Sequence, residues 1–136
     1  MSPIPWLPSI EPFENYGGDW EAYLNAIYAI FEHDFIKKKP IFRGKRLGLK
    51  RHPITQNKEA TFWHFTSEGK IEDERTPDLR RCERIRWPRA CINNSTAPEL
   101  KVWAENTSGR RRIYIWLETE GYLVVLDDRK DYLLPW

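Results

Sequence analysis

The sequence predicts an α+β domain in which N-terminal helices pack on a twisted antiparallel sheet of four to five strands. The first third supplies the helical observation, because residues 19–35 repeat apolar side chains at the spacing of one helix face. The last third supplies the strand observation, since apolar runs from residue 100 onward are separated by short turns that contain glycine. Helices first and strands last is the order typical of α+β folds.

A proline-rich segment precedes the predicted helix. Four of the ten prolines lie within the first 12 residues, and proline fixes φ and lacks a backbone donor. We therefore expect residues 1–18 to form an extended arm. Residues 19–136 are predicted to form a single α+β domain, because a chain of 136 residues falls in the usual range of one domain.

The middle of the chain is predicted to supply shorter elements. Residues 41–50 contain two glycines and are expected to form a loop and a short strand. Residues 60–66, ATFWHFT, are predicted to form a strand with alternating faces. A second helix is expected to begin with Thr76 as N-cap and Pro77 in the first helical position, and to end at Pro88.

The last third is predicted to form an antiparallel meander. Its strands are expected at residues 100–105, 111–118, 122–128 and from residue 132 onward. In the second of these, alternation places Ile113 and Ile115 on one face, and Arg112 and Trp116 on the other. We expect the apolar face to form the core. The other face is the expected RNA platform if no helix covers it.

Charge is strongly segregated along the chain, although the net charge is only +2. Residues 1–36 carry six acids and no Lys or Arg, whereas residues 37–58 carry nine Lys or Arg and no acid. Residues 75–89 add six arginines. Basic blocks of this kind favour a polyanionic partner such as RNA or DNA. The alternative is a solvated basic face, or one that pairs with the acidic N-terminal helix.

Other features of the sequence limit location and cofactors. An apolar run of about 18 residues is lacking, so no membrane span is expected. The chain opens without a basic-then-apolar leader, which predicts no secretory signal. Cys82 and Cys91 have no second pair to complete a disulfide framework or a four-cysteine zinc site. We expect a cytoplasmic protein without metal or cofactor, because metal-ligand and P-loop motifs are also lacking.

A family resemblance runs through the second half of the chain. The segments RRCERIRWPRACI, LKVW, RRIYIWLE, GYLVVLDDR and DYLLPW resemble a pattern in the BECR nuclease superfamily, named for barnase, EndoU, the tRNA-cleaving colicins and RelE. The likeness is to its phage- and toxin-associated branch and covers roughly residues 40–136. It implies helices on a twisted antiparallel sheet, an active site on the open sheet face, and metal-independent RNA cleavage. Members often continue into a T-x-Y-like segment that contributes to the site, whereas this sequence ends at Trp136.

Metal-independent RNA cleavage needs a base for the attacking 2′-hydroxyl, an acid for the leaving 5′ oxygen, and cations beside the phosphate. Histidine suits the proton transfers, and the candidates are His52, in the most basic block, and His64. Arg51 is expected to stabilise the phosphate, and Glu59 to orient a histidine or act as a base. The competing interpretations are a surface-loop histidine for His52, a core residue for His64 and a solvated strand end for Glu59.

Six further residues are candidates for RNA contact. Basic side chains would bind phosphates, a threonine hydroxyl would donate to a phosphate oxygen, and a tryptophan would stack on a base. The candidates are Lys50, Thr66, Arg81, Arg84, Arg112 and Trp116. Solvated arginines and aromatic residues packed in a core are the competing interpretations.

The sequence therefore predicts a toxin-like, metal-independent RNA endonuclease. Two alternatives stay open. One is a module of the same fold that binds RNA or a partner without cleaving, which the ending at Trp136 favours. The other is an accessory protein whose basic face docks an acidic partner, such as an antitoxin or immunity protein.

Overall fold

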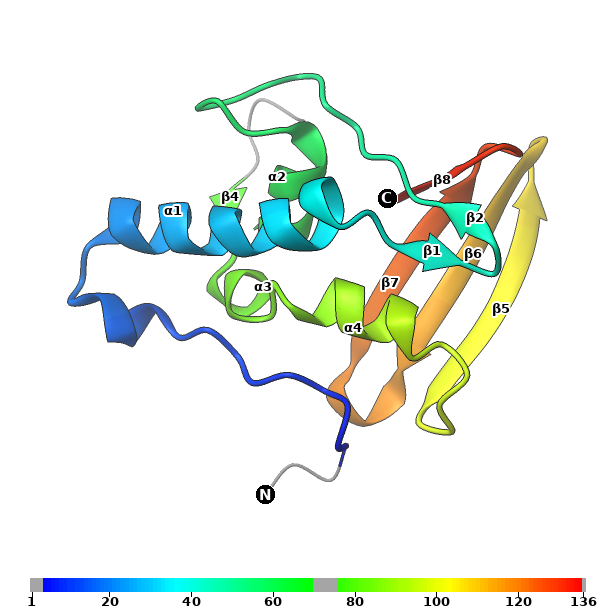
Figure 1. Cartoon of the computed structure of the whole chain (residues 1–136), viewed down its shortest axis with the longest axis horizontal. Helices are drawn as coiled ribbons and strands as arrows, with labels where there is room; N and C mark the ends of the chain where they lie inside the picture. The colour runs from blue at the N-terminus through cyan, green and yellow to red at the C-terminus, as the bar shows by residue number, and fades with distance from the viewer. Residues whose placement is uncertain (1–3, 70–75, 136) are drawn as a thin grey trace.

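The computed structural model describes residues 4–69 and 76–135. Helices lie on one side of the molecule and a four-stranded sheet on the other (Figure 1). The α-helices of these residues are α1 (Trp20–Phe31), α2 (Ala60–Thr66), α3 (Leu79–Glu83) and α4 (Trp87–Asn93). Helix α1 continues as the π-helical turn η2 (Glu32–Lys37), and two 3-10 turns are η1 (Phe13–Tyr16) and η4 (Glu118–Glu120). The predicted α+β class, with N-terminal helices against an antiparallel sheet, is confirmed.

In the described residues, the large sheet is an antiparallel meander in the order β5-β6-β7-β8. Its strands are β5 (Leu100–Thr107), β6 (Arg110–Leu117), β7 (Tyr122–Asp128) and β8 (Leu133–Pro135). Ser108 and Gly109 connect β5 to β6 with φ of 52° and 76°, positive values that a tight hairpin with twisted strands requires. Two small ladders pair β1 (Ile41–Phe42) with β2 (Lys45–Arg46), and β3 (Ser67–Glu68) with β4 (Thr76–Pro77).

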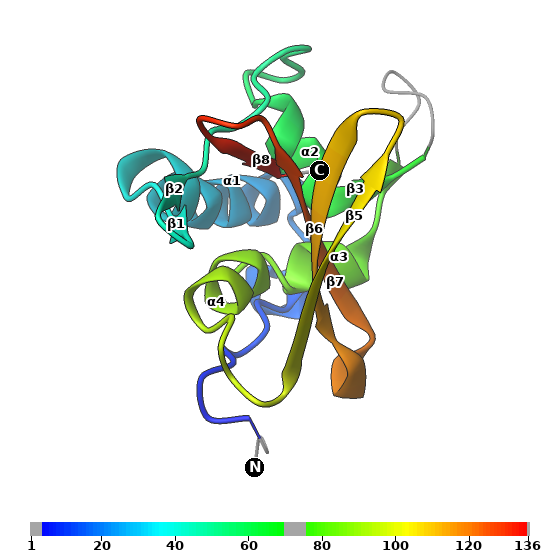
Figure 2. The same ribbon diagram turned by 90° about the vertical axis from the view of Figure 1, so that its right-hand side faces the viewer.

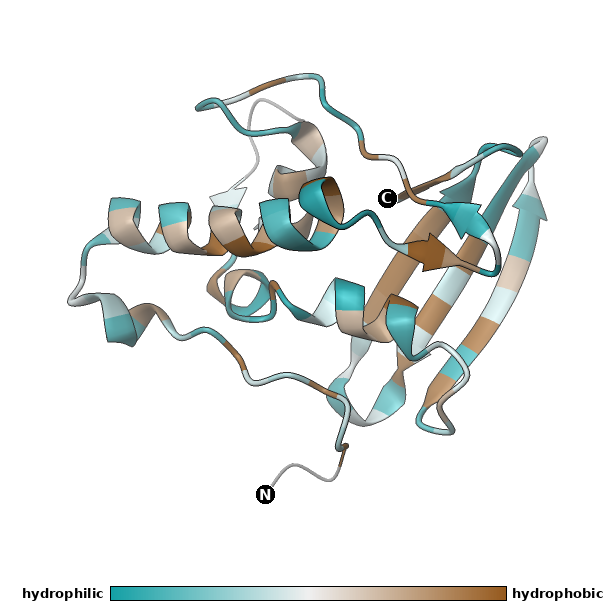
Figure 3. Cartoon of the chain, in the orientation of Figure 1, coloured by the Kyte–Doolittle hydropathy of each residue, from teal (hydrophilic) through white to brown (hydrophobic). Residues whose placement is uncertain are grey.

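The two faces of the large sheet differ, as the alternation predicts. Ile113, Ile115 and Leu117 of β6 are buried in the core, and Figure 2 shows α1 and α4 on one side of these strands. On the opposite face, Trp103 is 41% exposed and Leu123 is 44% exposed. Figure 3 shows the resulting change between polar and apolar residues along β6. We call the accessible side the open sheet face; by register it carries Lys101, Trp103, Glu105, Arg112, Tyr114, Trp116, Leu123, Val125 and the buried Asp127.

Residues 60–66 form the helix α2, so the predicted strand was wrong. Phe62 is fully buried, with its ring centroid 5.5 Å from that of Phe31. Phe65, one helical turn later, lies 5.2 Å from the ring of Phe35. Both rings therefore face α1 and η2, and the burial of aromatic surface outweighs the strand preference of so short a segment.

The predicted second helix consists of two short helices with a different start. Thr76 and Pro77 belong to β4, and Asp78 is the N-cap of α3, where its carboxylate accepts a hydrogen bond from the Arg80 backbone at 2.9 Å. Pro88 lies in the first turn of α4 and does not end a helix. A missing N–H costs no intrahelical hydrogen bond at that position, which explains why proline is accommodated there.

The N-terminal segment lies against the helices. Ile4 is buried in the core, and the Trp87 indole N–H donates to the Pro8 carbonyl at 3.0 Å. The Glu11 carboxylate accepts hydrogen bonds from the Arg86 guanidinium and from the Tyr16 hydroxyl. The segment is therefore attached to α4 and its surroundings by both apolar and polar contacts.

Replacement of Phe62 by alanine is expected to lower the free energy of unfolding by about 3–5 kcal/mol, the usual cost of deleting a buried phenylalanine ring. Ile54, which is 53% exposed in the loop before α2, offers a matched control. Ile54→Ala should change the free energy of unfolding by no more than about 0.5 kcal/mol. Urea unfolding followed by circular dichroism measures both variants, and a small effect of Phe62→Ala would contradict the packing of α2 on α1.

The attachment of the N-terminal segment should depend on pH. The hydrogen bond from Arg86, helped by the one from Tyr16, lowers the pKa of Glu11 below its ordinary value of 4.5, although burial acts in the opposite direction. A lowered folded-state pKa contributes stability that is present above the unfolded-state pKa and is lost as pH falls through the folded-state pKa. Glu11→Gln should therefore lose less stability than the unchanged protein between about pH 6 and about pH 3.

Urea unfolding at a series of pH values measures this difference. Glu14→Gln is the matched control, because Glu14 lies in the same segment but is exposed. An identical pH dependence of the unchanged protein and Glu11→Gln would rule out the Glu11 contribution.

Candidate nucleic-acid interface

A basic pocket lies between α2, α3 and the start of β7. Its volume is about 450 Å³. Three guanidinium groups and an imidazole line it, against a single carboxylate from Asp78. We call it the arginine pocket and define it by His64, Asp78, Arg80, Arg81, Arg84 and Tyr122. An excess of positive charge in a concave surface favours an anionic ligand.

Helix α3 presents arginines to this pocket because Cys82 of α3 and Ile85, two residues after its end, are held in the core. Arg81 donates from Nη1 to the Ser67 carbonyl at 2.7 Å, and its Nε lies 3.7 Å from the Asp78 carboxylate. These two contacts orient the guanidinium, while the Arg81 side chain stays 45% exposed. Arg81 is therefore both fixed and accessible to a ligand.

In the same pocket, the Arg84 guanidinium lies close to the aromatic rings of Trp87 and Tyr122. The Arg84 guanidinium carbon lies 4.6 Å from the centroid of the Trp87 ring and 5.9 Å from that of Tyr122. Burial raises the pKa of the Tyr122 phenol, although the charges of Arg84 and Arg81 act in the opposite direction. The phenol therefore keeps its proton at neutral pH and is a hydrogen-bond donor.

His64 reaches the pocket from α2. Its neighbours Phe62 and Phe65 face α1, so His64 projects from a different side of the helix and is half-buried in the lining of the pocket. The imidazole thus shares a cavity with arginines from another element. Imidazole can transfer protons and guanidinium can stabilise phosphate, so the arrangement combines two functions that phosphate chemistry uses.

The open sheet face runs directly into the arginine pocket. The strand register places Trp103, Tyr114 and Val125 in one row across β5, β6 and β7, and Trp116 beside Leu123 in the next. Val125 and Leu123 also line the pocket. The Trp103 and Tyr114 rings are stacked, with centroids 5.3 Å apart and planes at 12°. Aromatic side chains thus lie within one or two strands of the basic cavity.

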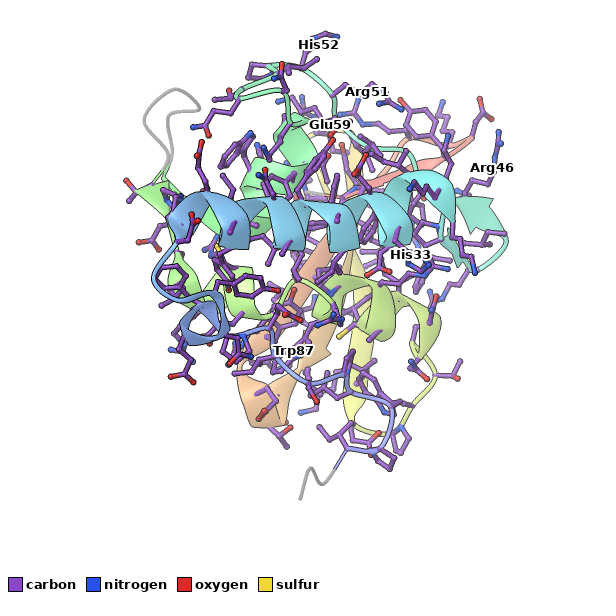
Figure 4. The ribbon with its side chains drawn as sticks, turned by 60° about the vertical axis from the view of Figure 1, so that its left-hand side comes forward. His33, Arg46, Arg51, His52, Glu59 and Trp87 are labelled. Atoms are coloured by element: carbon purple, nitrogen blue, oxygen red, sulfur yellow. The ribbon has the colours of Figure 1, made fainter. Side chains whose placement is uncertain are left out.

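The basic loop before α2 forms a separate cluster. The Glu59 carboxylate accepts a hydrogen bond from the Tyr28 hydroxyl at 2.7 Å and lies 3.5 Å from the Arg51 guanidinium. Burial is the main cause that raises the pKa of Tyr28, and this hydrogen bond is the second. Figure 4 shows His52 at the outer end of the loop, beyond Arg51 and Glu59. The Lys50 backbone N–H donates to the Thr61 hydroxyl at 2.7 Å. The cluster attaches the loop to α1 and α2.

Five of the ten predicted site residues lie in the arginine pocket or on the open sheet face. His64, Arg81 and Arg84 line the pocket. Trp116 and Arg112 lie on the open sheet face, on β6. The exposed sides of β6 and of the arginine-bearing helical segment were predicted correctly, which explains the agreement for four of these residues. His64 was expected on a strand, and it reaches the pocket from the helix α2 instead.

The other five predicted residues lie elsewhere. Lys50, Arg51, His52 and Glu59 belong to the loop cluster, and the lining of the arginine pocket includes none of these four. Thr66 is fully buried, and its hydroxyl donates to the Phe62 carbonyl at 3.0 Å. The expected contact between Thr66 and a phosphate was therefore wrong, because the helical turn of α2 sends this side chain into the core.

Three residues of the pocket were not among the predicted site residues. Arg80 lies in α3 next to the predicted Arg81 and is exposed. Tyr122 lies beside Arg84 because β7 packs on α4. Asp78 follows the predicted helix start at Thr76 and Pro77, and its residue type, which is common at helix N-caps, was the signal that could have identified it.

Residues 4–69 and 76–135 contain no group of three or more His, Cys, Asp and Glu side chains placed to hold a metal ion. None of the helices in these ranges has the length and apolar character needed to cross a membrane.

Asp78→Ala is expected to lower the free energy of unfolding by about 0.5–2 kcal/mol, because the N-cap of α3 is lost. Asp78→Asn keeps an acceptor oxygen for the Arg80 backbone while removing the charge beside Arg81, so it should retain most of the stability. Thermal unfolding compares the two variants. If asparagine costs as much as alanine, the ion pair with Arg81 and not the cap holds the start of α3.

Comparison with known proteins adds nothing to this geometry: no protein-family model, no curated protein and no solved structure matches the chain.

Proposed function

We propose that this chain is an RNA-cleaving endonuclease whose active site is the arginine pocket. The observation that carries the proposal is that His64 shares a cavity of about 450 Å³ with Arg80, Arg81 and Arg84. Cleavage of RNA by its own 2′-hydroxyl needs a group that transfers protons and cations that stabilise the phosphate, and the pocket contains both. The expected resemblance to the BECR superfamily agrees with this activity and is part of the proposal.

The reaction begins when the 2′-oxygen of a ribose attacks the adjacent phosphorus. His64 accepts the 2′-hydroxyl proton as that bond forms. The bond from phosphorus to the 5′ oxygen breaks, and this oxygen takes a proton from a water molecule, to which His64 returns the proton that it accepted. The guanidinium groups of Arg81 and Arg84 stabilise the negative charge that builds up on the phosphorane, and the Tyr122 phenol donates a hydrogen bond to it. The products are a 2′,3′-cyclic phosphate and a 5′-hydroxyl.

The surroundings of the pocket also support an RNA substrate. Trp103, Tyr114 and Trp116 lie on the open sheet face that leads into the pocket, and aromatic rings of this kind stack on bases. Positive charge in the same region attracts the phosphate backbone. An acidic antitoxin or immunity protein would be attracted by the same charge and is the proposed protein partner of such an enzyme.

A second candidate function is RNA binding without cleavage. The observation that favours it is that, among the described residues that line the pocket, His64 is the single imidazole. Arg81 and Arg84 are also engaged by protein groups, namely the Ser67 carbonyl and the Trp87 ring. A site with one proton-transferring histidine and preoccupied arginines would hold a phosphate more readily than cleave beside it.

His64→Gln is expected to reduce the rate of RNA cleavage by about 10²–10⁴-fold, the usual contribution of a positioned acid or base. The assay uses single-stranded RNA in excess EDTA and identifies the 2′,3′-cyclic phosphate end by chromatography and mass spectrometry. His52→Gln is the matched control, because His52 is exposed at the end of its loop, and it should cleave at the rate of the unchanged protein.

Both variants are first checked for folding by circular dichroism. Loss of activity in His52→Gln but not in His64→Gln would move the active site to the loop cluster. If the unchanged protein leaves RNA intact but binds it in a salt-sensitive way, the second candidate function, RNA binding without cleavage, is supported and the first is ruled out.

A further inference from the structure

A second basic hollow lies at the tip of the β5–β6 hairpin, on the open sheet face. Its volume is about 300 Å³. We call it the hairpin hollow, and it is lined by Glu105, Thr107, Ser108, Arg110, Arg112 and Tyr114. Three hydroxyl groups and two guanidinium groups thus line it, against one carboxylate. All these groups except the carboxylate can donate hydrogen bonds to a phosphate.

The alternation of β6 separates the three consecutive arginines. Arg111 points to the other face, where its Nε lies 3.6 Å from the Asp128 carboxylate. Arg110 and Arg112 point to the open sheet face and line the hairpin hollow. The strand therefore turns Arg111 to the other face and places Arg110 and Arg112 in the lining of the hairpin hollow.

One cross-strand pair links the hairpin hollow to the arginine pocket. Tyr114 lines the hollow, Val125 lines the pocket, and the two residues are register partners on neighbouring strands. Neighbouring strands lie about 4.7–4.9 Å apart, so the two cavities are close together. Trp103 is stacked on Tyr114 and is 41% exposed. An exposed aromatic stack thus lies beside the junction of two basic cavities.

We propose that the hairpin hollow is a second phosphate-binding subsite, and that the Trp103–Tyr114 stack holds a base of the nucleotide between the two subsites. The inference rests on the proposed function, since it takes the arginine pocket as the place where the scissile phosphate binds. The substrate is then an extended single strand longer than a dinucleotide. A duplex is excluded because its bases are paired and stacked on one another and cannot lie on the tryptophan.

The test is a binding measurement with the full chain and two probes that lack a free 2′-hydroxyl and so resist cleavage. The probes are fluorescently labelled 2′-O-methyl oligouridylates of nine and of two nucleotides, measured by anisotropy at low salt. Trp103→Ala is expected to weaken binding of the nine-nucleotide probe by about 5- to 100-fold, the effect of losing one stacked base. Binding of the two-nucleotide probe should stay unchanged, because it fills only the arginine pocket.

Arg110→Ala should likewise weaken binding of the longer probe only, and should make its salt dependence less steep by about 0.7 in the logarithmic slope. Trp103→Phe should restore most of the lost affinity, because phenylalanine also stacks. Arg46→Ala is the matched control, since Arg46 is an exposed arginine of β2 that lines neither cavity, and it should affect neither probe selectively.

The inference is overturned if Trp103→Ala and Arg110→Ala weaken both probes equally, if a nine-base-pair RNA duplex binds as tightly as the single strand, or if the longer probe does not bind the unchanged protein. These results are separate from the cleavage assay. If the protein cleaves RNA but the variants show no length-dependent effect on binding, the hairpin subsite is ruled out and the proposed function stands. If the variants show the length-dependent effect but the protein does not cleave RNA, the subsite stands as part of a module that binds RNA, and the proposed cleavage is ruled out.

Discussion

The contact between the buried rings of Phe62 and Phe31 is the constraint on which the rest of the arrangement depends. An α-helix turns by about 100° per residue, so a Phe62 ring directed at α1 leaves His64, two residues later, on another side of α2. That side faces the arginine pocket. The same contact brings the start of α2 to α1, where the Glu59 carboxylate meets the Tyr28 hydroxyl. Packing of one ring thus separates the histidine of the pocket from the carboxylate of the loop.

The large sheet could be predicted from the sequence because its pattern has a single interpretation. Ile113 and Ile115 alternate with polar or amphipathic residues along β6, and Gly109 marks the turn before it. The segment 60–66 has two interpretations: its residues 62, 64 and 66 alternate, and its residues 62, 65 and 66 share a helix face. Seven residues are too few to separate the two periods. Only the aromatic surface of α1, which is remote in sequence, decides between them.

The candidate site could be predicted where a regular element fixes the direction of each side chain. Arg81 of α3 and Arg84 at its C-cap line the pocket, away from the buried Cys82, and Trp116 lies opposite the buried side of β6. A loop has no such period, and nearness in sequence does not determine the direction of a side chain. Arg51 and Glu59 do meet across the loop, whereas His52, next to Arg51, projects outward.

Trp87 is in contact with two distant parts of the molecule. One face of its ring lies against the Arg84 guanidinium in the pocket, while its indole N–H holds the Pro8 carbonyl. An anion that drew Arg84 off the ring would change the electric field at the indole, so the emission of this tryptophan would report occupancy without an added dye. Attachment of the N-terminal segment would then be linked to ligand affinity, and by thermodynamic reciprocity each would alter the other by the same factor.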